Sequence, residues 1–185
     1  LCDARGILMM LDEVQTGIGR TGTLFAYEQA GIRPDVMTLA KALGNGFPVG
    51  AMLATEEVAR VFEPGTHAST FGGNPLAMAA VLSVLEAIDE EGLLKNCQEM
   101  GEYFLQKLSV LKRKHSLIRD IRGRGLLIGC ELGCEGAPYV SRCMQEGLLI
   151  NCTNANVLRF APPLVVTAGD IDRAADILDA ALGAS

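Results

Sequence analysis

The sequence has 185 residues, of which 49% are hydrophobic, and a formal net charge of −6 at pH 7. The sequence has only 16 Lys and Arg residues and no basic run longer than residues 112–114, which argues against a nucleic-acid partner. The longest apolar run, Ile7 to Leu11, is far shorter than the roughly 18 residues of a membrane span, so we expect a soluble protein with no membrane partner. Its mean hydropathy of +0.27 predicts apolar faces buried against a subunit partner or against further polypeptide.

The cysteines and histidines give no sign of a metal site or a disulfide framework. The six cysteines contain no CxxC pair, which favours reduced thiols in a cytoplasmic protein. Neither histidine, His67 or His115, has metal-ligand spacing from the other or from a cysteine, so we expect no metal. The absence of a G-x-S-x-G sequence also sets aside a Ser-His-Asp hydrolase.

Three short apolar runs in the first half predict strands. Ile7 to Leu11 has the continuous apolar character of a strand buried on both faces of a parallel sheet, and Val36 to Ala40 repeats this pattern. Val49 to Ala54 is the third run. Asp12 follows the first run and Lys41 follows the second. Both therefore stand at the carboxyl ends of predicted strands, where such sheets bind their ligands.

The second half predicts helices around a short sheet. A helix begins at Asn74-Pro75 and ends or bends at Gly92, and a second helical pattern follows. Three strand-like runs come next, and Thr167 caps a last helix. These runs are Gly125 to Leu132, Gly147 to Cys152, and Val157 to Phe160. We expect an α/β protein with part of a large domain over residues 1–92 and a small C-terminal domain over residues 93–185.

Residues 17–22 read GIGRTG, a literal match to the G-x-G-x-x-G turn of dinucleotide-binding folds. Its context argues against NAD binding. In those folds the first glycine directly follows the strand and an acid ends the next strand. Here residues 12–16 intervene, and Asp35 precedes its strand. A glycine-rich surface turn is the better interpretation of this run on its own.

Two segments carry a more specific signal. Residues 12–17, DEVQTG, resemble the DExxTG signature of the class III aminotransferases, and residues 39–46, LAKALGNG, resemble their AKxxGxG lysine segment. The resemblance implies the C-terminal part of a fold type I large domain, followed by a small α/β domain, in an enzyme that uses pyridoxal 5'-phosphate (PLP).

The resemblance implies roles for five residues of these segments. Asp12 would hold the proton on the cofactor ring nitrogen, which the cofactor needs to act as an electron sink. Lys41 would bind the cofactor covalently and then act as the base and acid that moves a proton. Val14 would pack on the ring, Gln15 would bind its hydroxyl side, and Glu13 would support the loop. Without the resemblance, Asp12 could be a strand-end cap and Lys41 a surface lysine.

Residues 67–75, HASTFGGNP, resemble a further block of the family. There the threonine binds the cofactor phosphate of the neighbouring subunit, which makes Thr70 a predicted phosphate ligand and Ser69 a neighbour of the substrate. The resemblance thus implies a homodimer with composite active sites. An ordinary loop that caps the next helix is the simpler alternative, and both can hold at once.

Arg159 lies in LRFAPPL, residues 158–164, which resembles the family's LRFxPPL block. The resemblance assigns its guanidinium to the substrate α-carboxylate, a planar group that an arginine fork binds well. A structural ion pair is the alternative for an arginine among apolar residues. The small-domain segment RGxGLxxG is matched too, by residues 122–129.

The resemblance covers the whole chain but not the first half of the family, so we expect a fragment that is inactive alone. It favours acetylornithine aminotransferases, because Phe71 follows Thr70 where ornithine enzymes tend to carry tyrosine. The implied reaction is amino transfer from N-acetylornithine to 2-oxoglutarate in arginine synthesis. Ornithine or another ω-amino acid is the alternative donor. A non-catalytic assembly or binding module is the alternative from a different class.

Overall fold

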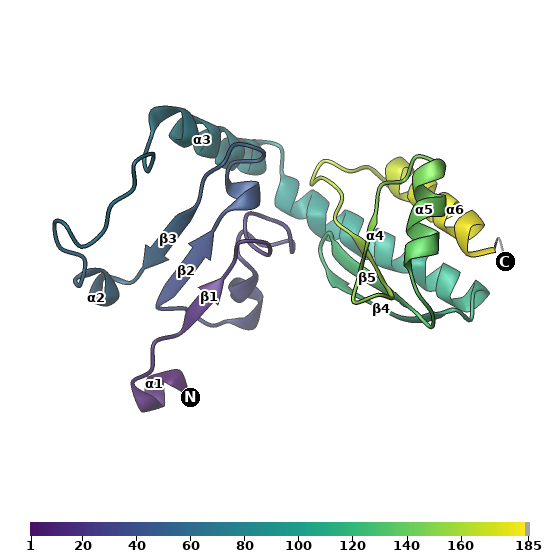
Figure 1. Cartoon of the computed structure of the whole chain (residues 1–185), viewed down its shortest axis with the longest axis horizontal. Helices are drawn as coiled ribbons and strands as arrows, with labels where there is room; N and C mark the ends of the chain where they lie inside the picture. Colours follow the sequence, from purple (N-terminus) through teal and green to yellow (C-terminus); the bar gives the residue numbers. More distant parts are fainter. Residues whose placement is uncertain (184–185) are drawn as a thin grey trace. The chain divides into compact units, whose positions relative to one another are not determined.

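The computed structural model describes residues 1–183 and divides the chain into two compact units (Figure 1). The first contains Leu1–Gly19 and Thr23–Gly92. The second contains the short segment Arg20–Gly22 together with the chain from Leu93 onward. The helix and strand content is the mixed α/β type that the sequence predicts.

The first unit is built on a three-stranded sheet in the order β1-β2-β3. The strands β1 and β2 are parallel, whereas β2 and β3 are antiparallel, an arrangement that the apolar runs did not predict. The elements of this unit are α1 (Cys2–Arg5), β1 (Met10–Asp12), the 3₁₀ helix η1 (Ala26–Ala30), β2 (Val36–Leu39), the 3₁₀ helix η2 (Lys41–Leu43), β3 (Ala51–Ala54), α2 (Glu56–Ala59) and α3 (Pro75–Glu90).

The first strand is shorter and more exposed than its sequence predicts. Only Met10–Asp12 pairs as β1, and the prediction of a strand buried on both faces is wrong for this chain. Ile7, Leu8 and Met10 are 54%, 56% and 65% exposed. The physical reason is that β1 has β2 on one edge only, and no helix of residues 1–183 packs closely on its faces. In contrast, Val36, Met37 and Leu39 of β2 are buried, as expected.

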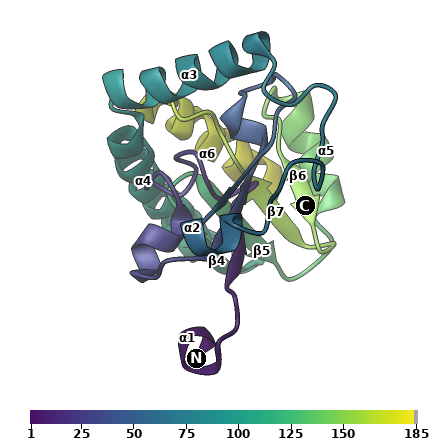
Figure 2. The ribbon, with the colours of Figure 1, turned by 90° about the vertical axis from the view of Figure 1, so that its left-hand side faces the viewer.

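The helix α3, labelled in Figure 2, begins at Pro75 and ends just before Gly92, as its sequence predicts. The Asn74 side chain accepts a hydrogen bond of 2.9 Å from the Ala77 amide, and Pro75 occupies the first helical position. Gly92 follows the helix with φ of +62° and allows the chain to turn. The apolar side chains of α3 are only partly covered, since Ile88 is buried while Leu76 is 66% exposed.

The second unit is a four-stranded antiparallel sheet with helices packed on one face. The strand order is β4-β5-β7-β6. Two of its elements, β4 and α5, were not predicted. Their sequences mix charged and apolar residues, without the continuous apolar run that marked the other strands. The elements are α4 (Leu93–Lys114), β4 (Ile118–Arg124), β5 (Leu127–Leu132), α5 (Ala137–Gln145), β6 (Asn151–Thr153), β7 (Val157–Phe160) and α6 (Ala168–Gly183).

The register of this sheet separates a buried face from an open one. Ile128 lies opposite Phe160 and Cys130 opposite Leu158, and all four are buried in one core with residues of α4, α5 and α6. Phe104 of α4 meets Phe160 edge to face at a centroid distance of 5.1 Å. The alternate residues point to the other face. One row of that open face runs through Arg122, Gly129, Arg159 and Asn151.

The residues described include no helix that is long and apolar enough to cross a membrane. Among residues 1–183 there is also no cluster of His, Cys, Asp and Glu side chains with the geometry of a metal site. The six cysteines are all free thiols.

Close backbone packing holds α4 against the β4–β5 turn. A Cβ atom on Gly101 of α4 would lie 2.4 Å from the carbonyl oxygen of Gly125, so no larger residue fits there. We therefore expect Gly101→Ala to destabilise the chain by about 2 kcal/mol through overpacking. The matched control is Gly169→Ala in the first turn of α6, where the nearest atom to the new methyl is 3.8 Å away. Urea unfolding measures both, and equal effects would contradict this account.

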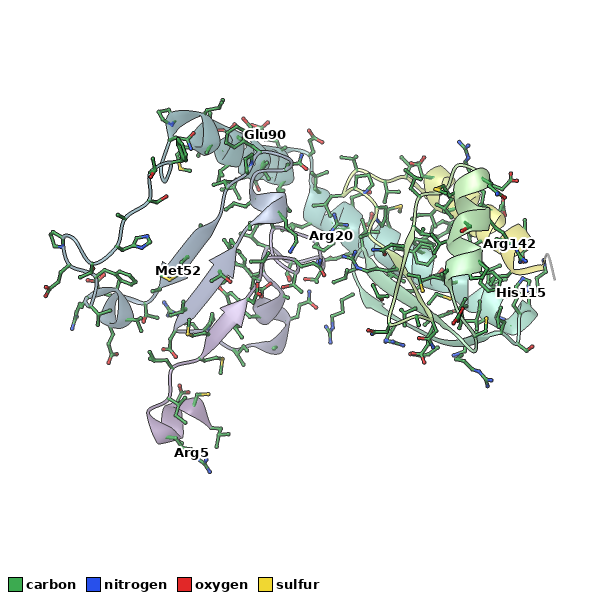
Figure 3. The ribbon with its side chains drawn as sticks, viewed as in Figure 1. Arg5, Arg20, Met52, Glu90, His115 and Arg142 are labelled. Atoms are coloured by element: carbon green, nitrogen blue, oxygen red, sulfur yellow. The ribbon has the colours of Figure 1, made fainter. Side chains whose placement is uncertain are left out.

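Polar side chains join α6 to the last turn of α4. Asp179 Oδ2 lies 2.5 Å from Lys114 Nζ, and its Oδ1 lies 2.5 Å from Nε2 of His115, which Figure 3 labels. Hydrogen bonds from Lys114, the larger effect, and from His115 hold the pKa of Asp179 below its ordinary value. The pairing therefore stabilises the fold above the unfolded pKa of about 4, and this stability is lost as the pH falls through the folded pKa.

We expect Asp179→Asn to reduce the dependence of stability on pH below about pH 5. Urea midpoints measured from neutral to acidic pH should fall less steeply for this variant than for the wild type. Asp176→Asn is the control, because Asp176 is an exposed carboxylate of the same helix. Parallel curves for wild type and Asp179→Asn would refute the role of the pair.

Candidate functional site

The parallel pairing of β1 and β2 brings the two central predicted residues to neighbouring strand ends. Asp12 is the last residue of β1 and pairs with Thr38 of β2, and Lys41 follows the end of β2. Asp12 Oδ1 accepts a hydrogen bond of 2.9 Å from the Val14 amide and one of 3.5 Å from Thr38 Oγ1. Both the Asp12 and Lys41 side chains are exposed. A carboxylate and an ammonium group are thus presented at one edge of the sheet.

The backbone after β2 is unusual for residues other than glycine. Lys41 has φ of +48° and Asn45 has φ of +43°, both in the left-handed region. Gly44 lies between them, and a Cβ atom there would be 2.3 Å from the carbonyl oxygen of Phe47. Strained backbone that the surroundings enforce is common at functional sites. Here it sets the direction in which the Lys41 side chain leaves the sheet.

The loop after β1 is organised around a buried carboxylate. Glu13 is 3% exposed, and its Oε1 accepts a 2.9 Å hydrogen bond from the Tyr27 amide while its Oε2 accepts one from the Thr16 hydroxyl. Its own amide donates to the Thr38 carbonyl at 3.0 Å. A Cβ on Gly17 would lie 2.8 Å from the Glu13 carbonyl oxygen. These contacts hold the loop that carries Val14 and Gln15, the first half-buried and the second exposed.

Ser69 and Thr70 lie in an exposed loop that leads into α3. Neither residue forms a hydrogen bond to Asp12 or Lys41. The Cβ and Oγ of Ser69 would be 3.0 Å from a Cβ on Gly72, so this turn requires a glycine or a small shift. Phe71 between these residues and Gly72 is 80% exposed. The structure thus presents this loop at the surface of the first unit.

Arg159 belongs to the second unit, in the middle of its sheet. It lies in β7 opposite Gly129 of β5 and Asn151 of β6, and its side chain is half-buried on the open face. No Asp or Glu of residues 1–183 forms an ion pair with it. Arg122, in the same row, differs, because its guanidinium lies 2.9 Å from Asp120 and 2.6 Å from Glu131. Arg122 is thus a member of a structural ion pair, whereas Arg159 has no such pair within residues 1–183.

The glycine-rich run 17–22 is not the surface turn that its composition favours. Ile18 is 2% exposed, and the glycines at both ends of the run are buried. Within the run, Arg20–Gly22 belongs to the second unit, and the Arg20 guanidinium donates hydrogen bonds to the Leu126 and Pro162 carbonyls. Sequence analysis did not predict these contacts, because the partners of Arg20 lie more than a hundred residues away along the chain.

Comparison with known proteins gives a consistent result. A family profile described as aminotransferase class III matches residues 1–182. The acetylornithine aminotransferase of Caldanaerobacter subterraneus subsp. tengcongensis is 54% identical over 180 residues, which is 97% of this chain and 46% of the relative. That of Methanocaldococcus jannaschii is 49% identical over 181 residues, with 97% and 45% covered. The chain spans about half the length of these curated relatives.

Solved structures agree. The acetylornithine aminotransferase of Elizabethkingia anophelis superposes with a TM-score of 0.93 at 36% identity, covering 98% of this chain and 47% of that one. An ornithine aminotransferase of Plasmodium yoelii gives 0.93 at 34% identity, covering 98% and 49%. The arrangement of strands and helices described above is therefore that of a known fold.

The hydrogen bonds of the buried Glu13 can be tested by substitution. Glutamine at this position keeps the size but can offer only one carbonyl oxygen, so either the Tyr27 amide or the Thr16 hydroxyl loses its acceptor. We expect Glu13→Gln to destabilise the chain by about 2 kcal/mol. The control is Glu28→Gln, an exposed position. Denaturant unfolding distinguishes them, and a Glu13→Gln variant as stable as the control would count against the buried network.

Proposed function

Because the chain belongs to the class III aminotransferase family, we propose that its protein transfers the δ-amino group of N-acetylornithine to 2-oxoglutarate with PLP as cofactor. The observation that carries this proposal is the pair Asp12 and Lys41 at adjacent carboxyl ends of two parallel strands. The high identity to acetylornithine aminotransferases supports the choice of donor and a place in arginine synthesis.

The groups at this sheet edge fit the cofactor chemically. Asp12 Oδ1 has two donors within the chain, and none of the hydrogen bonds that the structure defines reaches Oδ2, so a carboxylate oxygen is available for a protonated ring nitrogen. The exposed Lys41 amine suits an aldehyde. PLP, when bound, withdraws electrons from the substrate carbon that bears the amino group. Asp12, Glu13, Val14, Gln15, Lys41 and Thr70 would hold it.

Lys41, Asp12 and Glu13 have different roles in the proposed reaction. The Lys41 amine takes a proton from the substrate carbon that carries the amino group and later returns one, as a general base and acid. The fixed Asp12 carboxylate keeps a positive charge at the ring nitrogen position. Glu13 acts indirectly, by holding the loop on which Val14 and Gln15 stand.

We assign substrate recognition to Arg159 and Ser69. The Arg159 guanidinium, without an acidic partner in the part of the chain that the structure describes, would bind the substrate α-carboxylate through two parallel hydrogen bonds. Ser69 would lie beside the substrate. The matched arginine Arg122 is already neutralised by Asp120 and Glu131, and is therefore excluded from this role.

We further propose a homodimer in the cytoplasm. Apolar side chains are exposed in and after the loop that carries Thr70, with Phe71, Leu76 and Leu82 at 80%, 66% and 59%. Such a patch favours a protein partner, and a second subunit would let Thr70 reach the cofactor phosphate across the interface. Free thiols at all six cysteines suit a reducing compartment.

The test uses the chain co-expressed with the N-terminal half of an acetylornithine aminotransferase. Sodium borohydride should attach PLP covalently to the wild-type protein but not to Lys41→Ala. Lys95→Ala is the control and should react like the wild type, because the Lys95 side chain is 79% exposed. We expect Lys41→Ala to lower amino transfer by at least about a thousandfold. Retained activity in this variant would refute the mechanism. A preference for ornithine over N-acetylornithine would keep the mechanism and change the substrate, and absence of PLP attachment would favour a non-catalytic module.

A further inference from the structure

The turn that follows η2 has Asn and Gly at its two central positions. The Phe47 amide donates a 3.0 Å hydrogen bond to the Gly44 carbonyl, which closes a four-residue turn. The central residues, Asn45 and Gly46, have φ of +43° and +109°. Positive φ at both positions is required in a type I′ turn, where Asn-Gly is a preferred pair. The backbone conformation thus explains why this pair occurs here.

The Asn45 side chain and the Gly46 amide have no hydrogen-bond partner within residues 1–183. Both residues are exposed. None of the hydrogen bonds that the structure defines uses the Asn45 carboxamide or the Gly46 N–H. A Cβ atom on Gly46 would meet no atom within 4 Å, so this side of the turn is open. The carboxamide is therefore free to rotate toward the next peptide nitrogen.

These two groups can react with each other. The Gly46 nitrogen attacks the Asn45 side-chain carbonyl carbon, an N–C bond forms, and the bond from that carbon to the side-chain nitrogen breaks. The Gly46 N–H proton leaves with this nitrogen as ammonia, and a cyclic imide remains. Water then opens the imide at either carbonyl and gives aspartate or isoaspartate at position 45. Glycine favours the attack because no Cβ atom hinders the approach of its nitrogen.

We propose that Asn45 is a site of spontaneous deamidation, with the Gly46 nitrogen as nucleophile and water as co-reactant. In the isoaspartate product the main chain passes through the former side chain and is longer by a methylene group. This added length disrupts the turn between Gly44 and Phe47. The Asn45 amide also donates to the Lys41 carbonyl at 3.2 Å, so the change extends to the backbone of the lysine.

The test is peptide mapping by mass spectrometry, with the chain co-expressed with the N-terminal half of an acetylornithine aminotransferase and the purified complex kept in mildly alkaline buffer. The peptide that contains Asn45 should gain the mass difference between –OH and –NH₂, and an isoaspartyl methyltransferase should label it. Asn154 is the internal control, because it is exposed and has φ of +50° but is followed by Ala155. We expect Asn45 to react at least about tenfold faster than Asn154, since the Ala155 Cβ hinders the attack.

Two variants test the chemistry. Asn45→Gly keeps a residue that tolerates positive φ but removes the carboxamide, so this turn should show no mass gain. Gly46→Ala should slow the reaction at Asn45 at least about fivefold through the added Cβ. No mass gain at Asn45 in the wild type, or equal rates at Asn45 and Asn154, would overturn the proposal. If Gly46→Ala does not fold, the comparison of the two asparagines in the wild type decides.

The effect on Lys41 has its own readout and rests on the proposed function. Attachment of PLP by borohydride should fall in proportion to the isoaspartate fraction of the aged wild type, and should stay constant in aged Asn45→Gly. Deamidation without loss of attachment would refute this effect alone. Failure of fresh wild type to attach PLP would refute the proposed function, while the mass gain at Asn45 would still establish the modification site.

Discussion

The parallel hydrogen-bonded ladder between β1 and β2 is the constraint on which the candidate site depends. It sets Asp12 opposite Thr38, so the acid at the end of one strand and the lysine after the next emerge at the same sheet edge. An antiparallel pair would have sent these two strand ends in opposite directions. The roles proposed for Asp12 and Lys41 therefore depend on strand direction, which brings together residues that are distant in sequence.

Buried polar contacts and close backbone approach then give this edge a defined shape. The Glu13 carboxylate accepts hydrogen bonds from Thr16 of its own loop and from Tyr27 of η1, which compensates for its removal from water. Gly17 and Gly44 lie where a Cβ atom would collide with a main-chain carbonyl. Together they specify one backbone path around Asp12 and Lys41, including the left-handed conformation of the lysine.

The second unit shows how a sheet register can distinguish two arginines of one row. Arg122 and Arg159 flank Gly129 on the open face, but of the two only Arg122 forms ion pairs within residues 1–183. The opposite face packs against α4, α5 and α6 and contributes to a hydrophobic core. Arg159 is thereby held by a well-packed strand, and no Asp or Glu of residues 1–183 forms an ion pair with its guanidinium.

Local signals in the sequence determined β2, the cap and first turn of α3, and the segments that contain Asp12, Lys41 and Arg159, because these depend on neighbouring residues. The sequence did not determine the antiparallel direction of β3, the exposure of β1, or the elements β4 and α5, since each depends on which segments meet in space. The same holds for Arg20. Only the tertiary structure placed its guanidinium against the Leu126 and Pro162 carbonyls, because hydrogen bonds across more than a hundred residues leave no pattern in the local sequence.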